Sequence, residues 1–428
     1  MPATIALIAH DSKKDDIVEF ATQHQVCLSR YRLIATEATG HRIQAATGLT
    51  IKRMLPGSMG GDTQIAAEVC SGQVVAVFFL VDSLQAQPHE PEIQTLLRVC
   101  NIHNVALATN RASAEAIATQ LAKVLVAHLI FNPVAGPGNA DRDLALIQQL
   151  LEPHFNLHIH FTTPEVNPAT LAQEAIAAQA DLVIASGGDG TISTVAGALI
   201  GTSIPLGIIP RGTANAFAAA LGIPQLFPLR LACQTILTGN TRTVDVARCN
   251  NLPMILLAGV GYEAEMVNRA TRELKQQWGV MAYLMAGWKL LDEQTLFDLE
   301  IEVSGQVHHL QASAITVANA APPTSIMAQG AGQVIFDDGL LDVTISTASN
   351  KVQAVTSMLK MFGSALFKVN PQQPNIFQGR VNAIKIDTTP PQKVVVDGEV
   401  IGTTPIKIEC IPKGLTVFSP DASFQRTA

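Results

Sequence analysis

The sequence has 428 residues, of which 48% are hydrophobic and only 5% aromatic. At roughly 150 residues per domain this length predicts two or three domains, and apolar runs of Ala, Val, Ile and Leu favour stacked α/β layers over a disordered or fibrous chain. The formal net charge of -7 argues against nucleic-acid binding, so we expect no nucleic-acid partner, while phosphorylated metabolites stay possible ligands. The six cysteines show no zinc-like spacing, which favours a reduced, cytoplasmic protein.

Short β-branched runs alternate with helical segments between residues 4 and 121. Alternation of this kind predicts βαβ units, and therefore a doubly wound parallel sheet covered by helices on both faces. The expected strands are TIALIA (4–9), YRLIA (31–35), TIKRML (50–55), VVAVFFLV (74–81) and VALAT (105–109). Even the longest of these runs is far shorter than the roughly 20 residues that a membrane-spanning helix needs, so we expect any membrane contact to be peripheral.

A second alternating region begins near residue 127, which predicts a second α/β sheet and a domain boundary near 121–127. Its expected strands lie in AHLIFNPVAG (127–136), LHIHFT (157–162), DLVIAS (181–186) and PLGIIP (205–210). From about residue 245 the pattern changes to strands and hairpins, which predicts an antiparallel β lobe. We therefore expect a parallel-sheet domain over 1–123, an α/β nucleotide-binding lobe over 124–245 and a β-rich lobe over 246–428, with the return of the last strand to the α/β lobe left open.

Two helical stretches interrupt the β-rich lobe, at residues 272–291 and 350–368. The second contains Met and Phe beside Lys360 and Lys368. Such a stretch either rests on a membrane surface through its apolar side or packs into the core with its lysines in water, and core packing is favoured.

Three loops rich in Gly and Asn follow expected strands of the second α/β region. They are FNPVAG (131–136), SGGDGT (186–191) and RGTAN (211–215). Because loops at the carboxyl ends of parallel strands gather at one edge of the sheet, we expect them to form one site. Glycines let the backbone approach a ligand closely, and a following helix N-terminus supplies unpaired N–H groups. This edge therefore suits the phosphates of a nucleotide, although a tight strand-to-helix turn is the alternative for any single loop.

These loops, together with DDGLLDV (337–343) and VDGE (396–399), resemble the diacylglycerol kinase catalytic family, in particular bacterial soluble lipid kinases, across roughly 127–420. The resemblance implies a two-lobed kinase that uses ATP and Mg²⁺ to phosphorylate a lipid hydroxyl such as that of diacylglycerol, in phospholipid metabolism. NAD kinases and phosphofructokinases share the GGDG element, but this sequence lacks the Asn-Glu pair that NAD kinases carry after it. A non-lipid acceptor, such as a sugar or a nucleotide, is the alternative.

The same resemblance implies roles for single residues. Asp397 would be the general base that takes the proton of the acceptor hydroxyl, with Glu399 nearby. The implied ATP ligands are Asn132, Gly187, Gly188, Asp189, Gly190, Thr191, Gly212, Thr213 and Asn215, with Asp189 near the metal of the nucleotide. A second, more structural Mg²⁺ is implied at Asp337, Asp338 and Asp342, with a turn of solvated carboxylates as the alternative. Ala216 departs from the family, in which many members have Asp after the Asn.

Four polar loops follow the expected strands of the first domain and should gather at the carboxyl edge of its sheet. They are AHDSKK (9–14), ATEATG (35–40), PGSMGGDTQ (56–64) and DSLQAQPHEPE (82–92). Two histidines, several carboxylates, lysines and Gly/Thr-rich segments at one edge are what an enzyme acting on a small phosphorylated carbonyl compound requires. Together these motifs resemble methylglyoxal synthase, across about 4–121.

This second resemblance implies a lyase that converts dihydroxyacetone phosphate through an enediolate into methylglyoxal and phosphate. Asp62 would be the base, and His89 would move protons between the oxygens. The implied lining of the site adds His10, Asp11 and Asp82. The implied phosphate ligands are Lys14, Thr36, Thr39 and Gly57.

The phosphate-binding residues depart from this family at several positions. Glu37 and Ala38 replace a Gly and a Thr, and Pro56 replaces a Ser. Glu92 stands where the family has Asp. Each lost hydroxyl contact costs roughly 1 kcal/mol or more, and a nearby carboxylate repels phosphate. The domain is therefore either an active lyase, which the retained acid and histidines favour, or a sensor of a phosphorylated metabolite that regulates the kinase. Homo-oligomerisation is left open.

Overall fold

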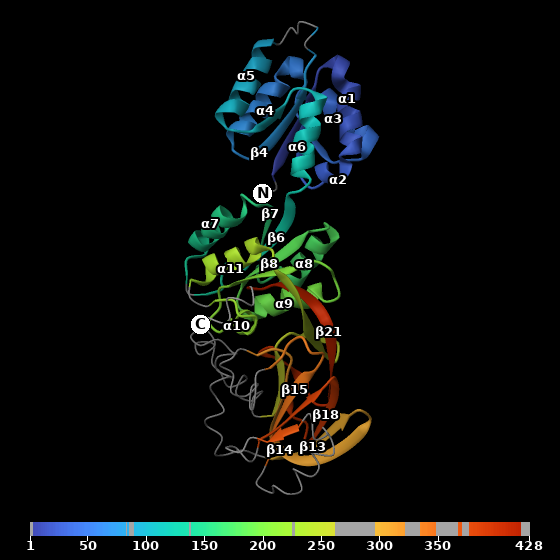
Figure 1. Ribbon diagram of the computed structural model, residues 1–428, viewed down its shortest axis with the longest axis vertical. Helices are drawn as coiled ribbons and strands as arrows, with labels where there is room; N and C mark the ends of the chain where they lie inside the picture. Colours follow the sequence, from blue (N-terminus) through green and yellow to red (C-terminus); the bar gives the residue numbers. More distant parts are fainter. Residues whose placement is uncertain are drawn as a thin grey trace. The chain divides into compact units, whose positions relative to one another are not determined.

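The computed structural model describes residues 3–82, 84, 90–136, 138–224, 227–261, 296–321, 334–347, 367–369 and 376–420. The chain forms two compact units, one of residues 1–127 with 152–158 and the other of residues 128–151 with 159–428 (Figure 1). His89, the expected helix at 272–291 and residues 350–366 lie outside the described residues. The end of the second expected helix is described as a strand, β16 (Phe367–Val369), and its helical interpretation is wrong there.

A five-stranded parallel sheet forms the centre of the first unit, in the order β3-β2-β1-β4-β5. Its strands are β1 (Thr4–Ala9), β2 (Arg32–Ala35), β3 (Ile51–Arg53), β4 (Val74–Leu80) and β5 (Ala106–Ala108). The central strands β1 and β4 are apolar along nearly their whole length because both faces of the sheet are covered. The parallel sheet that the alternating pattern predicts is thus confirmed.

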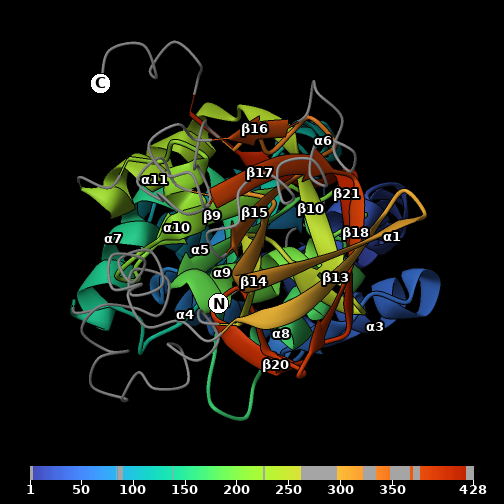
Figure 2. The same ribbon diagram turned by 90° about the horizontal axis from the view of Figure 1, so that it is seen from below.

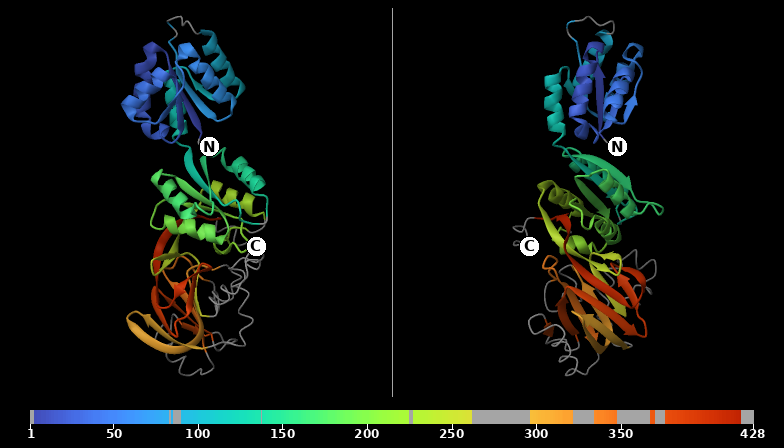
Figure 3. Two further views of the ribbon diagram at one scale, coloured as in Figure 1. Left: turned by 180° about the vertical axis from the view of Figure 1, so that it is seen from behind. Right: turned by 90° about the vertical axis from the view of Figure 1, so that its right-hand side faces the viewer.

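Helices cover both faces of this sheet (Figure 3). One face carries α1 (Lys14–Gln23), α3 (Glu37–Thr47) and α6 (Arg111–Leu121), and the other carries α4 (Gly61–Cys70) and α5 (Glu90–Ile102). Phe20 of α1 and Ile43 of α3 are fully buried on the first face, and Ile65 of α4 and Leu96 of α5 on the second. Shorter helices in this unit are η1 (Asp11–Lys13), α2 (Gln25–Leu28) and η2 (Gly57–Met59).

One continuous sheet runs through the second unit, in the order β16-β17-β15-β14-β13-β18-β21-β9-β8-β6-β7. Its α/β part contains β6 (Leu125–Phe131), β7 (Phe155–Phe161), β8 (Leu182–Gly187) and β9 (Leu206–Pro210). The helices of this part are α7 (Ala140–Leu151), α8 (Pro168–Ala177), α9 (Asp189–Leu199), α10 (Ala216–Ala220) and α11 (Pro228–Thr238). α8 packs against α9, and α7 packs against α11.

The β-rich part of the second unit is antiparallel, as the sequence predicts. Its strands are β10 (Thr241–Cys249), β11 (Leu252–Met254), β12 (Leu257–Gly261), β13 (Phe297–Val303), β14 (Gln306–Ala318), β15 (Leu341–Thr347), β17 (Ile376–Val381), β18 (Ala383–Thr389), β19 (Lys393–Val396), β20 (Glu399–Thr403) and β21 (Ile406–Phe418). Figure 2 shows β13, β14 and β15 next to one another, in orange tones. Alternate residues of β13, such as Phe297 and Leu299, are buried because one face of the sheet covers the core.

The last strand, β21, joins the two parts of the second unit. It pairs antiparallel with β10 and β18, and parallel with β9 through Val417 and Leu206. The strands of the α/β part and those of the β-rich part therefore belong to one sheet. In the described part of the chain, no helix has the length and apolar character that crossing a bilayer requires.

Candidate active sites

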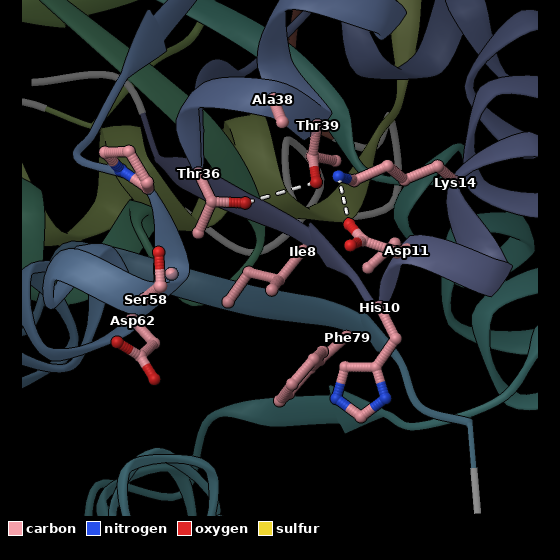
Figure 4. Close-up of a pocket in the computed structure, with 13 residues that line it drawn as sticks. Ile8, His10, Asp11, Lys14, Thr36, Ala38, Thr39, Ser58, Asp62 and Phe79 are labelled. Carbon is pink, nitrogen blue, oxygen red and sulfur yellow. Dashed lines mark hydrogen bonds and ion pairs between the residues drawn. The ribbon is translucent and has the colours of Figure 1, made fainter. Parts of the chain in front are cut away.

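A cavity of about 410 Å³ opens at the carboxyl edge of the sheet in the first unit (Figure 4). It is lined by Ile8, Ala9, His10, Asp11, Lys14, Thr36, Ala38, Thr39, Pro56, Gly57, Ser58, Asp62 and Phe79. Seven of the residues singled out in the sequence therefore come together: His10, Asp11, Lys14, Thr36, Thr39, Gly57 and Asp62. Asp82 is not among the lining residues. No sequence motif predicts Ile8, Ser58 or Phe79 as lining residues.

Two glycines place Asp62 at the cavity wall. Gly60 has φ +90°, which side-chain-bearing residues rarely adopt, and a Cβ on Gly61 would lie 1.9 Å from the carbonyl oxygen of Leu55. This turn starts α4 at Gly61, so Asp62 falls in the first turn of the helix. Its side chain is buried against the cavity with 5% exposure, and its Oδ1 accepts the backbone N–H of Thr63 at 3.0 Å. Only glycine suits both positions, which explains the conspicuous Gly-Gly-Asp sequence.

His10 faces Asp62 from the other side of the cavity (Figure 4). Its Nδ1 accepts the backbone N–H of Asp82 at 3.0 Å, which assigns the proton of the neutral imidazole to Nε2. The ring also meets the edge of Phe79, with centroids 5.3 Å apart. His10 is therefore fixed as a donor through Nε2.

Asp82 supports His10 from outside the cavity. Its carboxylate accepts the hydroxyl of Ser12 at 2.6 Å and the backbone N–H of Leu84 at 3.0 Å. The bond from Ser12, followed by that from Leu84, holds the pKa of Asp82 below its ordinary value. The sequence predicts Asp82 at the site. In the structure Asp82 does not line the cavity, and its backbone N–H binds the ring of His10, which does.

The opposite end of the cavity is suited to an anion. Thr36 lies just before the first turn of α3 and donates its hydroxyl to Oγ1 of Thr39 at 3.1 Å. Lys14 forms an ion pair with Asp11, and that contact holds the pKa of Asp11 below its ordinary value. A helix N-terminus, a lysine and threonine hydroxyls together favour a phosphate group. Glu37, which could have repelled it, is exposed and not among the lining residues.

In the second unit, the three Gly/Asn loops meet where β6, β8 and β9 end. The backbone N–H of Asn132 donates to the carbonyl of Ser186 at 2.9 Å, and that of Arg211 donates to the carbonyl of Gly187 at 2.8 Å. A Cβ on Gly212 would lie 2.7 Å from the Cα of Gly188, so these two loops touch through glycine. The convergence expected from the parallel strands is present.

Side chains fix these loops to one another. Asn132 donates through Nδ2 to Oγ1 of Thr191 at 2.9 Å, and Oδ1 of Asn215 accepts the N–H of Gly212 at 2.8 Å. Asp189 accepts the backbone N–H of Ala216 at 2.6 Å, and burial raises the pKa of its carboxyl. Thr213 and Gly190 are exposed at the edge.

Arg211 is a buried cation that the sequence analysis missed. Its side chain is only 3% exposed, lies over the ring of Phe131, and donates to Oδ2 of Asp143 at 3.0 Å and to the carbonyl of Asn132 at 2.7 Å. It ties the loop after β6 to the loop after β9. The only sequence signal is a charged residue at the end of an apolar run.

Asp397 lies in the two-residue turn between β19 and β20. Both Asp397 and Gly398 have positive φ, the conformation of a tight hairpin turn that Asp-Gly favours. The carboxylate accepts three consecutive backbone N–H groups, those of Ile255 at 2.8 Å, Leu256 at 2.8 Å and Leu257 at 3.0 Å. Burial outweighs these bonds and raises the pKa of Asp397 to about 6. Glu399 is exposed at the start of β20.

The aspartates expected to hold a second Mg²⁺ are paired with arginines. Asp337 accepts from Arg242 at 2.6 Å. Arg380 donates to Asp338 at 2.9 Å and to Asp342 at 3.0 Å. Across the described residues, no group of three or more His, Cys, Asp or Glu side chains is placed to hold a metal ion. As arranged, these carboxylates do not fit a bound cation, and their role as metal ligands stays a prediction.

A fourth aspartate organises the same turn. Asp245 on β10 is 1% exposed and accepts the backbone N–H groups of Gly339 at 2.6 Å and Lys413 at 2.7 Å. It joins the 337–342 turn to β21. A single acid within an apolar strand is the sequence signal for this residue, which the motifs do not include.

Three family models match separate parts of this chain. A family model described as "MGS-like domain" matches residues 16–109. One described as "Diacylglycerol kinase catalytic domain" matches 126–249, and one described as "YegS C-terminal NAD kinase beta sandwich-like domain" matches 257–419.

Similar proteins cover both the whole chain and its parts. An uncharacterised protein of Synechocystis sp. is 53% identical over 98% of this chain and 99% of its own length. A methylglyoxal synthase of Thermus thermophilus is 56% identical over 28% of this chain and 94% of its own. A solved structure described as a diacylglycerol kinase from Bacillus anthracis is 27% identical, with a TM-score of 0.53, and covers 70% of this chain and 98% of its own.

Proposed function

Because the chain belongs to both families, as a fusion of a methylglyoxal synthase-like domain with a diacylglycerol kinase catalytic region, we propose that it is a bifunctional enzyme. Its first domain would convert dihydroxyacetone phosphate into methylglyoxal and phosphate. Its second region would transfer the γ-phosphoryl group of ATP to a lipid hydroxyl. The observation that carries the lyase is the cavity in which Asp62 and His10 lie at one end and the anion-binding groups at the other.

The lyase reaction follows from that arrangement. Lys14 and Thr39 bind the phosphate of the substrate, with Thr36 donating to the hydroxyl of Thr39, and this places the carbon chain between Asp62 and His10. Asp62 removes a proton from the hydroxyl-bearing carbon, which lies on the other side of the carbonyl from the phosphate ester, and Nε2–H of His10 donates to the carbonyl oxygen as it becomes an enediolate oxygen. Collapse of the enediolate then forms an aldehyde and a C=C bond to the ester carbon as the C–O bond to phosphate breaks. The resulting enol becomes methylglyoxal when its terminal carbon takes up a proton. His89 is the proposed carrier of protons between the two oxygens.

A non-catalytic sensor is the alternative for this domain. A sensor needs the anion-binding end of the cavity. It does not need the carboxylate of Asp62, which Gly60 and Gly61 hold opposite the Nε2–H donor of His10. Incubation of the purified chain with dihydroxyacetone phosphate is expected to yield methylglyoxal and phosphate in equal amounts. Absence of methylglyoxal, together with a change in ATP turnover when the compound is added, would establish the sensor instead.

The kinase proposal rests on Asp397 and the three loops. An ionised Asp397 accepts the proton of the acceptor hydroxyl as it attacks the γ-phosphate, and the loops after β6, β8 and β9 bind the phosphates of ATP. Mg²⁺ that accompanies ATP would neutralise charge on the transferring group.

The acceptor is proposed to be a lipid, since the similar Bacillus anthracis protein is described as a diacylglycerol kinase. A lipid acceptor implies peripheral contact with a membrane. The chain would be supplied with labelled ATP and either a lipid extract or a pool of soluble metabolites. Label in the lipid extract is expected, whereas label only in the soluble pool would point to a sugar or a nucleotide.

The kinase reaction is expected to lose rate as the pH falls through about 6. Asp397, with its pKa raised to about 6, accepts a proton above that pH and is already protonated below it. We expect kcat/KM for the acceptor to fall about tenfold per pH unit below the pKa. Because the pKa of Asp397 is raised in the folded chain, protonation of this carboxyl favours the folded state. That stability is present at low pH and is lost as the pH rises through about 6. A lower rate in acid is therefore not explained by loss of this stability.

The measurement is a pH–rate profile at saturating ATP, with Glu300→Gln as the control. Glu300 is an exposed residue of β13 and should leave the profile unchanged. A flat wild-type profile between about pH 5 and about pH 8 would rule out Asp397 as the titrating base.

A further inference from the structure

Ser58 lines the cavity of the first unit from a short helix, η2, that approaches from the side of Asp62. Figure 4 shows its side chain next to Asp62, with its hydroxyl directed toward the end of the cavity where Thr36 lies. Its neighbour Pro56 also lines the cavity but carries no hydrogen-bond donor. Ser58 is therefore the hydroxyl that η2 brings to the cavity.

The donors of the cavity are distributed unevenly. Thr36, Thr39 and Ser58 are the hydroxyl residues among its described lining. Thr36 already donates to Thr39, so the hydroxyl protons of Thr39 and Ser58 are the two left to meet a ligand. Lys14 and Thr39 come from α1 and α3, whereas Ser58 comes from the other side of the cavity. A tetrahedral anion presents oxygens in several directions, and donors from one side alone cannot satisfy them.

We propose that Ser58 is a substrate-binding residue that donates a hydrogen bond to the phosphate group from the side of Asp62. This inference rests on the proposed lyase function. With Lys14 and Thr39 opposite, the bond holds the phosphate between two walls and so fixes the position of the carbon chain, with its hydroxyl-bearing carbon beside Asp62. Ser58 thereby favours a substrate whose acidic carbon is separated from the ester carbon by one carbonyl carbon, which describes a short phosphorylated hydroxyketone.

A second role is chemically possible for the same hydroxyl, and it leads to different kinetics. If Ser58 donated to the carboxylate of Asp62, it would alter proton abstraction, and its loss would change kcat and its pH profile. A bond to phosphate is made in both the bound substrate and free phosphate. Its loss raises KM for the substrate and the inhibition constant of inorganic phosphate together and leaves kcat nearly unchanged.

The test compares Ser58→Ala, Ser58→Thr and a control in the full-length chain. Ser71→Ala serves as the control, because Ser71 ends α4 away from the cavity and donates to the carbonyl of Glu68. For Ser58→Ala we expect KM for dihydroxyacetone phosphate and the inhibition constant of phosphate each to rise about tenfold, the effect of one hydrogen bond to a charged group. Ser58→Thr keeps the hydroxyl and should stay within about threefold of the wild type.

The outcomes separate this proposal from the proposed function. Unchanged KM and phosphate inhibition in Ser58→Ala would overturn it, as would a shift in the pH profile of kcat without a change in KM. If the wild type forms no methylglyoxal, the lyase function fails. Calorimetric titration with inorganic phosphate then still decides the role of Ser58. Weaker phosphate binding by Ser58→Ala but not by Ser71→Ala supports the role, and equal binding by Ser58→Ala and Ser71→Ala contradicts it.

Discussion

Replacing Asp397 with Asn is expected to lower phosphoryl transfer by about 10²- to 10⁴-fold, the range that a general base contributes. An amide cannot accept the proton of the acceptor hydroxyl, whereas the carboxylate with a pKa of about 6 is ionised and basic at neutral pH. The measurement is the initial rate of transfer from labelled ATP to the lipid acceptor. ATP binding should change little, because the three loops proposed to bind its phosphates follow β6, β8 and β9.

The structural cost of this substitution must be separated from the chemical one. Both carboxylate oxygens of Asp397 accept backbone N–H groups. The NH₂ group of an Asn would therefore face another donor, either the N–H of Ile255 or those of Leu256 and Leu257. Leaving a buried donor unsatisfied costs about 1–3 kcal/mol, which lowers the unfolding midpoint without unfolding a domain of ordinary stability. Glu300→Gln, at an exposed position of β13, is the control, with full rate expected. A folded Asp397→Asn chain that keeps more than a tenth of the wild-type rate would exclude the base assignment.

Replacing Asp62 with Asn is expected to lower methylglyoxal formation by about 10²- to 10⁴-fold. Here the fold should be nearly unaffected, because the amide oxygen of Asn can still accept the N–H of Thr63. Loss of a negative charge from the first turn of α4 costs about 0.3–1 kcal/mol. The rate is followed by the appearance of methylglyoxal.

Asp16→Asn provides the control for this substitution. Asp16 lies on α1, is paired with Lys13 and does not line the cavity. It should keep the wild-type rate of methylglyoxal formation. If Asp62→Asn kept that rate as well, another group in the cavity would have to be the base.

The alternation of strand and helix allowed the parallel sheet of the first unit to be predicted, and the change to strands and hairpins after about residue 245 allowed the antiparallel β-rich lobe to be predicted. Asp397 and Gly398 form a tight hairpin turn in which both have positive φ, whereas the VDGE sequence is interpreted only as a motif of the family resemblance. The long strand β21 was harder to predict. Pro412 and Gly414 within it are typical of turns, and only its pairing with β10 and β9 on opposite sides makes it one strand.

Within the candidate sites, residues with a local signal could be predicted and those that depend on tertiary contacts could not. Asp62 follows two glycines, which is visible in the sequence. Nothing local shows that Asp82 holds His10 through its backbone, or that η2 turns Ser58 into the cavity.

The ion pairs of Arg380 with two aspartates could not be predicted from the sequence either. Arg380 lies on β17 and its partners Asp338 and Asp342 are about forty positions away in sequence, so the three aspartates read as a metal site when taken alone. The pairing depends on the register between β15 and β17, in which Asp342 stands opposite Arg380. No local pattern specifies that register.

The claim that one chain carries two separate active sites is tested by measuring both reactions on wild type, Asp62→Asn and Asp397→Asn in parallel. Each preparation is assayed for methylglyoxal from dihydroxyacetone phosphate and for transfer from ATP to a lipid, after its unfolding midpoint has been determined. We expect Asp62→Asn to lose only methylglyoxal formation and Asp397→Asn to lose only phosphoryl transfer. Loss of both reactions in either folded variant would contradict two independent sites.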